Sequence, residues 1–129
     1  MSKLDDFLGL NDVSDVRETI KETINGKELE MVIRPLTNDE HTEYQKRCQV
    51  ISKKSVSFDT GKYNNLVLTS CIVEPNFNSE EFLSKAKCQT SYEFIAKKFP
   101  AGVIADISQK IQKLSGFETF DLDIEEAKN

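Results

Sequence analysis

The sequence contains few cysteines, and their spacing excludes two structural devices that small proteins often use. The 129 residues include three cysteines, Cys48, Cys71 and Cys88. Their odd number and the lack of a C-x-x-C pair exclude a disulfide framework and a zinc knuckle. We therefore expect reduced, buried thiols in a chain that is long enough to form a core without covalent cross-links or a structural metal.

Glycine and long apolar runs are also scarce. The five glycines each stand alone, so no glycine-rich loop of the kind that holds nucleotide phosphates can form. No run of about 18 uncharged apolar residues occurs. The opening MSKLDDFLGL places two aspartates where a secretory signal has its apolar core. These features predict no nucleotide site, no membrane association and a cytoplasmic location.

The sequence lacks an excess of basic residues. The formal net charge is −5, and residues 117–129 contain five acidic residues and one lysine, so the remaining body is nearly neutral. A protein that binds nucleic acid needs a basic face that displaces counterions from the phosphates. We therefore exclude nucleic acid as a partner and treat residues 117–129 as an acidic C-terminal tail.

Asn25-Gly26 is the strongest turn signal in the chain, because a type I′ turn needs two residues that accept a positive φ. A turn there pairs residues 18–24 with residues 27–33 in an antiparallel hairpin that has one apolar face. The predicted apolar face comprises Ile20, Ile24, Leu29, Met31 and Ile33. The alternative is a helix with apolar residues at helical spacing, namely Val13, Val16, Ile20 and Ile24. We favour the hairpin.

About five helices are predicted after the hairpin. Thr37 begins a T-x-x-E capping box, and the helix that follows carries an apolar stripe of His41, Tyr44, Cys48 and Ile51. Residues 52–60 are predicted to be a loop, and the next helix is predicted to continue until Pro75, which would stop it.

The stretch CIVEPNFNSEEF is predicted to be a corner between two helices. With Asn78 as the N-cap, Glu81 completes a capping box, and Phe77 and Phe82 have the spacing of a hydrophobic staple. Each of these residues then has a structural role.

The last two helices have clear ends. Thr90 is predicted to cap one of them, with Glu93 at the third helical position. After Pro100 the final helix is predicted to end at Gly116, whose left-handed conformation lets Phe117 fold back onto the helix.

Potential catalytic groups are isolated. His41 is the only histidine, and Cys48 lies about 10 Å away along a helix, whereas a Cys-His pair needs a distance of about 3 Å. Glu80 and Glu81 are adjacent, so they diverge on a helix and suit its N-terminus better than acid-base work. We predict no enzymatic activity, no cofactor and no metal.

Two short apolar segments lie outside the core stripes, and each is too small to form a core alone. We predict that they take part in partner binding or self-association, as segments that fold onto a larger partner do. Their residues are Phe7, Leu8 and Leu10 near the N-terminus, and Phe120, Leu122 and Ile124 in the tail. Docking onto the body of the same chain is an equal alternative, and the tail is compatible with a strand, a short helix or disorder.

Four segments of this sequence resemble one known family. The segments are IRPLTNDEHTEYQKRC, CIVEPNFNSEEF, LSGFE and the terminal IEEAKN. In this order, from about residue 33 to residue 129, they resemble the XkdN-like tail assembly chaperones of contractile-tailed phages and prophages of Gram-positive bacteria.

The resemblance implies a function without chemistry. Such a protein is expected to bind the tape measure protein, keep it soluble and assist tail tube assembly by bringing tail tube protein to it. It is expected in the cytoplasm of the bacterial host and to be absent from the mature virion. The alternative is a structural adaptor or minor component that is retained in the phage tail.

These observations together predict a predominantly α-helical α+β fold, with about five helices and a small N-terminal antiparallel hairpin. We expect residues 1–15 to be a mobile N-terminal segment, residues 16–116 to form a single globular domain, and residues 117–129 to be the acidic tail.

Overall fold

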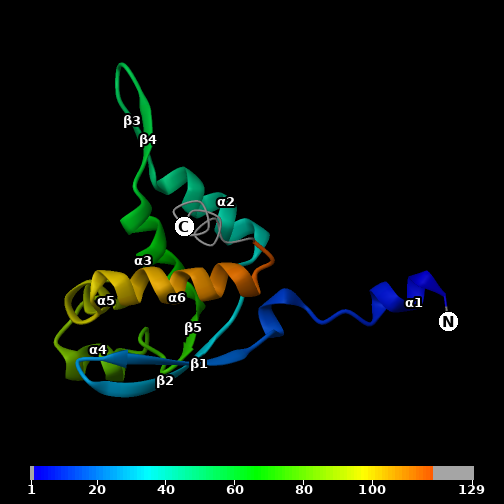
Figure 1. Ribbon diagram of the computed structural model, residues 1–129, viewed down its shortest axis with the longest axis horizontal. Helices are drawn as coiled ribbons and strands as arrows, with labels where there is room; N and C mark the ends of the chain where they lie inside the picture. The colour runs from blue at the N-terminus through cyan, green and yellow to red at the C-terminus, as the bar shows by residue number, and fades with distance from the viewer. Residues whose placement is uncertain (1, 118–129) are drawn as a thin grey trace, which may run out of the picture.

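A computed structural model describes residues 2–117 of the chain. Within this range lie six α-helices, a 3₁₀ helix and five strands, so the predicted class, a mostly helical α+β fold with an N-terminal hairpin, is confirmed (Figure 1). The five predicted helices are α2 to α6, and α1 is an addition. In chain order the elements are α1 (Lys3–Leu8), η1 (Val13–Asp15), β1 (Glu18–Ile24), β2 (Lys27–Ile33), α2 (Asn38–Arg47), β3 (Gln49–Ile51), β4 (Val56–Phe58), α3 (Thr60–Cys71), β5 (Ile72–Glu74), α4 (Glu80–Ala86), α5 (Ser91–Lys98) and α6 (Ala101–Leu114).

The β1–β2 hairpin has the predicted register, with Ile24 opposite Lys27 and Glu18 opposite Ile33. Asn25 and Gly26 have φ values of 54° and 80°, as a type I′ turn requires. Four of the five predicted apolar side chains are buried, whereas Leu29 is 41% exposed. The alternative helix is wrong, because residues 18–24 form a strand.

A third strand, β5, was not predicted. The helix that was expected to continue to Pro75 ends at Cys71, and residues 72–74 instead pair antiparallel with the other edge of β2. The backbone N–H of Arg34 donates to the carbonyl of Cys71 over 2.9 Å at this junction. Ile72 and Val73 are β-branched and favour a strand. The edge of β2 offers hydrogen-bond partners to the backbone of residues 72–74, which replace the bonds that a longer α3 would have made.

The structure differs from the prediction in a second place. Where the end of a helix and a loop were predicted, residues 49–58 form a small hairpin, β3–β4. Helix α2 ends at Arg47, so Ile51 is not part of its stripe and is 75% exposed. Val56 and Phe58 alternate with serines, which is the period of a strand rather than of a loop. The serines of the turn stabilise it, because the backbone N–H of Ser55 donates to the Ser52 hydroxyl over 3.2 Å.

The corner after β5 is confirmed, but its cap is one residue later than predicted. Ser79, and not Asn78, caps α4 and accepts from the backbone N–H of Phe82 over 3.2 Å. Asn78 is used elsewhere, since its amide donates to the carbonyl of Thr69 over 3.0 Å. Phe77 and Phe82 do make contact, with ring centroids 5.1 Å apart.

The other predicted caps are confirmed. Thr37 and Glu40 form a capping box at α2, and Thr90 caps α5. Gly116, with a φ of 95°, follows α6, and the backbone N–H of Phe117 returns to the carbonyl of Gln112 over 3.0 Å. This is a Schellman motif. The ring of Phe117 also packs against His41 of α2, with centroids 4.7 Å apart, so this residue connects the end of α6 to α2.

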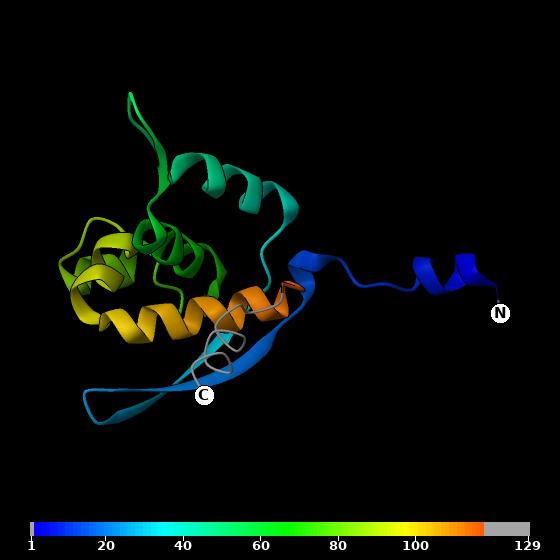
Figure 2. The ribbon, with the colours of Figure 1, turned by 45° about the horizontal axis from the view of Figure 1, so that its top comes forward.

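The core lies between the three-stranded sheet and the helices α3, α5 and α6. Figure 2 shows α6 between the β1–β2 hairpin and α3, and α3 packs against both α5 and α6. The side chains with no exposed surface in this layer include Ile33, Leu68, Ile95, Ile107 and Ile111. Burial of each such side chain contributes about 1.5–3 kcal/mol, so this layer fixes the positions from which the other segments project.

Candidate partner-binding surfaces

The predicted N-terminal segment forms a short helix with an exposed apolar surface. Ser2 caps α1 through a capping box with Asp5. Leu4, Phe7, Leu8 and Leu10 are 68–74% exposed. In both Figure 1 and Figure 2, α1 lies apart from the rest of the described chain. We call residues 2–17 the N-terminal arm. Three predicted site residues, Phe7, Leu8 and Leu10, thus lie together on it.

The other three predicted site residues, Phe120, Leu122 and Ile124, lie outside the described residues. The described chain ends at Phe117, which lies beside α2 through its contact with His41.

The β3–β4 hairpin is a second exposed apolar surface, and the prediction from sequence missed it. Gln49 pairs with Phe58, and Ile51 pairs with Val56, so Ile51, Val56 and Phe58 share one face of the ribbon. Ile51 and Val56 are 75% and 66% exposed. The base of the hairpin is anchored to α3, where the Phe58 ring lies 5.5 Å from the Tyr63 ring. The serine-apolar alternation in residues 55–58 was the signal that could have revealed this strand.

An apolar pocket opens beside the middle of β2, at residues 29–31. It has a volume of about 170 Å³ and is lined by Leu29, Glu30, Met31, Pro75, Phe77, Phe94 and Phe99. The aromatic rings of this wall belong to one cluster, in which Phe77 contacts Phe82, Phe94 and Phe99. The pocket explains why Leu29 remains partly exposed, because its side chain forms the rim rather than part of the core.

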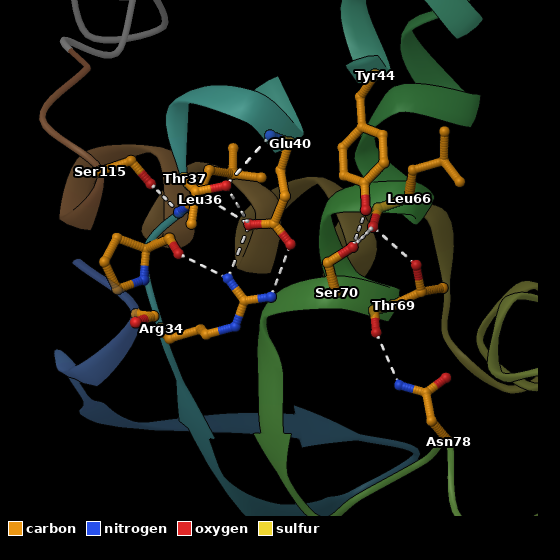
Figure 3. Close-up of polar contacts among 12 residues, drawn as sticks. Arg34, Leu36, Thr37, Glu40, Tyr44, Leu66, Thr69, Ser70, Asn78 and Ser115 are labelled. Carbon is orange, nitrogen blue, oxygen red and sulfur yellow. Dashed lines mark hydrogen bonds and ion pairs between the residues drawn. The ribbon is translucent and has the colours of Figure 1, made fainter. Parts of the chain in front are cut away.

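A larger groove, of about 560 Å³, is mainly polar and lies where β2, α2, α3 and α5 meet. Arg34 and Glu40 lie on its wall and form a bidentate ion pair with distances of 2.8 and 2.7 Å (Figure 3). This hydrogen bond to the Arg34 guanidinium is the main reason that the pKa of Glu40 is lowered, and the bonds from Thr37 act in the same direction. Glu40 is therefore ionised at neutral pH.

Several other polar groups in or beside this groove also have partners within the protein. The Tyr44 hydroxyl bonds to the Ser70 hydroxyl, and the Thr69 hydroxyl donates to the carbonyl of Leu66 over 2.8 Å (Figure 3). Nearby, the Ser115 hydroxyl accepts from the backbone N–H of Leu36 over 2.8 Å, which ties the end of α6 to the start of α2. These bonds connect elements that are distant in sequence, and we interpret the groove wall as structural.

Two of the three predicted buried thiols are buried, whereas Cys88 is partly exposed. Cys48 and Cys71 are buried, and burial raises the pKa of both thiols, that of Cys71 to about 12. A neutral thiol is a weak nucleophile. His41 Nδ1 lies 3.0 Å from the Tyr63 hydroxyl, so the partner of the histidine is a tyrosine of α3. Among residues 2–117, no cluster of His, Cys, Asp and Glu side chains is suited to hold a metal ion.

Comparison with known proteins identifies the family. The chain matches the model of the phage XkdN-like tail assembly chaperone proteins over residues 4–128. It therefore belongs to this family, as the sequence motifs predicted. No curated protein matches the sequence. Within the described part of the chain, no helix combines the length and the apolar character that are needed to cross a membrane.

The fold is similar to that of a solved structure. The crystal structure of the protein YqbN has a TM-score of 0.53 to this chain and 17% sequence identity, and the similarity covers 79% of this chain and 87% of that one. At this identity the similarity concerns the fold alone.

Proposed function

We propose that this tail assembly chaperone binds the tape measure protein of its phage, keeps it soluble and assists assembly of the tail tube around it. The observation that carries the proposal is the N-terminal arm, which lies apart from the core and on which Leu4, Phe7, Leu8 and Leu10 are 68–74% exposed. Contiguous exposed apolar residues are typical of protein-binding surfaces. Membership of the chaperone family supports a partner in the phage tail.

The length of α1 suits a segment that gains stability from its partner. It has six residues, whereas isolated helices shorter than about 12 residues are marginal in water. Docking of Phe7 and Leu8 against a long helical partner would cover apolar surface on both proteins. A tape measure protein presents such surface repeatedly, so modest contacts made by many copies of the chaperone would add up to effective cover.

Co-expression with the tape measure protein tests this proposal. The variant Phe7→Asp/Leu8→Asp should lower the amount of chaperone that co-purifies with the tape measure protein about tenfold or more, and should leave more tape measure protein insoluble, because charges in the apolar patch oppose its burial. Ile51→Asp/Val56→Asp is a matched control, since these side chains are similarly exposed. Undiminished co-purification of the Phe7→Asp/Leu8→Asp variant would show that the arm is not the binding surface.

The composition of finished particles separates a chaperone from a retained adaptor. We expect purified virions to lack this chain, because an assembly factor leaves once the tape measure protein is enclosed. A fixed number of copies per virion would instead indicate a structural component.

A further inference from the structure

Two exposed apolar surfaces of this chain carry opposite charge. One is the N-terminal arm, which contains four aspartates, one lysine and one arginine. The other is the β3–β4 hairpin together with its flanking residues, since residues 46–62 contain five basic residues and one aspartate. The chain as a whole has a net charge of −5, so the basic hairpin region contrasts with the rest of the molecule. Surfaces of opposite charge attract each other and favour a specific encounter.

The basic residues lie at both ends of the hairpin. Lys53 and Lys54 are in the turn at its tip. Lys46 and Arg47 end α2 directly before the hairpin, and Lys62, in the first turn of α3, donates from Nζ to the carbonyl of Arg47 over 3.2 Å. None of the five forms an ion pair with another described residue. The apolar face of the hairpin therefore lies between two groups of unpaired positive charges.

This apolar face remains largely exposed in the described part of the chain. Its three side chains are 38–75% exposed, namely Ile51, Val56 and Phe58. Within residues 2–117 the hairpin pairs with no further strand, and isolated two-stranded hairpins are at best marginally stable in water. A segment that lies on the face, rather than beside an edge of the hairpin, would bury these side chains.

Helix α1 has the size and the pattern to cover this face. Leu4, Phe7 and Leu8 are spaced i, i+3 and i+4, so they lie on one side of the helix, and Asp5 flanks them. The six residues of α1 form a helix about 9 Å long, and the three residues of each hairpin strand span about 10 Å. A helix of this length that lies along the hairpin would cover its apolar face and bury its own apolar side at the same time.

We propose that the N-terminal arm of one copy docks on the β3–β4 hairpin of a second copy, with the apolar side of α1 against the apolar face of the hairpin. In both Figure 1 and Figure 2, α1 and this hairpin lie at separate ends of the described chain, so an arm does not lie on the hairpin of its own molecule. Each copy has one arm to donate and one hairpin to accept. Such contacts can continue from copy to copy unless they close into a ring.

The contact involves only copies of this chain, so it does not depend on the proposed binding of the tape measure protein. A tape measure protein that binds the arm would compete with the hairpin for it. Until then, docking would cover two apolar surfaces that are otherwise exposed to water. The interface is small, and interfaces that bury less than about 1,200 Å² in total are typically weak and transient. We therefore expect reversible association that increases with protein concentration.

Two full-length variants, each lacking one side of the contact, test the proposal. Phe7→Asp/Leu8→Asp alters the arm and Ile51→Asp/Val56→Asp alters the hairpin, because a charge that would have to be buried opposes docking. In sedimentation velocity without tape measure protein, the mass of the natural protein should rise with concentration, whereas each variant alone should stay a monomer. An equal mixture of the two variants should form a heterodimer, since it combines one intact arm with one intact hairpin.

The outcomes separate this contact from other modes of association. Continued self-association of the arm variant alone would overturn the proposal, because another segment, such as a second hairpin or the C-terminal tail, would then make the contact. Continued self-association of the hairpin variant alone would overturn it as well, because the arms would then bind elsewhere. A natural protein that stays monomeric, or a mixture without heterodimer, would also contradict it. All four substituted positions are exposed, and thermal unfolding of each variant checks that its fold is intact.

Charge reversal in the same mixture tests the electrostatic part. Lys53→Glu/Lys54→Glu in the copy that supplies the hairpin should weaken the heterodimer about fivefold, since exposed charge pairs contribute modestly, and added salt should weaken it too. The matched control is Lys21→Glu/Lys27→Glu in the same copy, which makes an equal change of net charge on the β1–β2 hairpin and should have a much smaller effect. Equal weakening by both pairs of substitutions, or by neither, would overturn docking beside the basic tip.

Discussion

The two hairpins of this protein share a strand pattern but differ in what covers them. Each strand of β1–β2 has seven residues, and four apolar side chains on its inner face are less than 9% exposed. Each strand of β3–β4 has three residues, and its apolar face remains largely exposed. Alternation of apolar and polar residues therefore predicts a strand in both cases, whereas burial depends on whether a helix lies against the face.

Helix α6 is the element that makes the difference. Glu22 lies on the inner face of β1–β2 between Ile20 and Ile24, and Lys110 of α6 forms an ion pair with it at 2.9 Å. The Glu22 side chain is 10% exposed, and burial is the main reason that its pKa is raised. No comparable helix lies over Ile51 and Val56 in the described part of the chain, and these side chains are therefore available to another segment.

The largest effect should come from removing one apolar side chain from each hairpin. Ile33→Ala empties a fully buried site and should lower the free energy of unfolding by about 3–4 kcal/mol. Ile51→Ala, at a site that is 75% exposed, should change it by no more than about 0.5 kcal/mol. Urea denaturation of both variants measures these values, and similar losses would show that the second hairpin is also part of the core.

The ion pair that links the covered hairpin to α2 should have the next largest effect. Arg34 follows β2, and Glu40 lies in the helix that leads into β3; their side chains are 18% and 23% exposed. Glu40→Gln should cost about 2 kcal/mol at neutral pH, because it weakens two charge-assisted hydrogen bonds. Glu81→Gln, which alters the exposed pair of Glu81 with Lys85, is the control and should have little effect.

The Glu40→Gln effect should depend on pH in a defined direction. Because the pKa of Glu40 is lowered in the folded state, its contribution is complete above the pKa of an unfolded glutamate, about 4.3. The contribution is lost as the pH falls from there through the lower pKa of the folded protein. The difference in stability between the natural protein and the variant should therefore shrink below about pH 4.3, as urea denaturation at several pH values would show. A constant difference would exclude ionisation of Glu40 as its source.

The turn of the covered hairpin should show the smallest of these effects. Gly26 has a φ of 80° and open space around the position of a Cβ atom, so Gly26→Ala should cost about 1–2 kcal/mol through backbone strain alone. Gly102→Ala also meets no neighbour but lies in α6 without a positive φ, and it should stabilise the protein by about 0.5–1 kcal/mol. Thermal unfolding should show a lower melting temperature for Gly26→Ala and a higher one for Gly102→Ala. A lower melting temperature in both variants would contradict the idea that the positive φ of Gly26 causes the difference.

Much of the local structure could be predicted because short-range rules determine it. Asn25-Gly26 gave the register of the first hairpin, Thr37 and Thr90 gave two helix starts, and Gly116 gave the end of α6. Each feature depends on backbone conformation or on hydrogen bonds among residues that are close in the chain. For Phe7, Leu8 and Leu10 the sequence left open whether they dock onto the body of the chain, and the structure leaves them exposed.

The sequence by itself thus determined the turns, most helix ends and the mostly helical class of this protein. Only the tertiary structure decided that residues 72–74 pair with β2, that α2 stops before Ile51, and that Phe117 packs on His41. It also decided which of two similar hairpin faces is buried. The physical reason is that an apolar or strand-forming pattern predicts that a segment will be buried or paired, but it does not identify the segment that it contacts. That segment comes from a distant part of the chain, so the contact is known only from the folded structure.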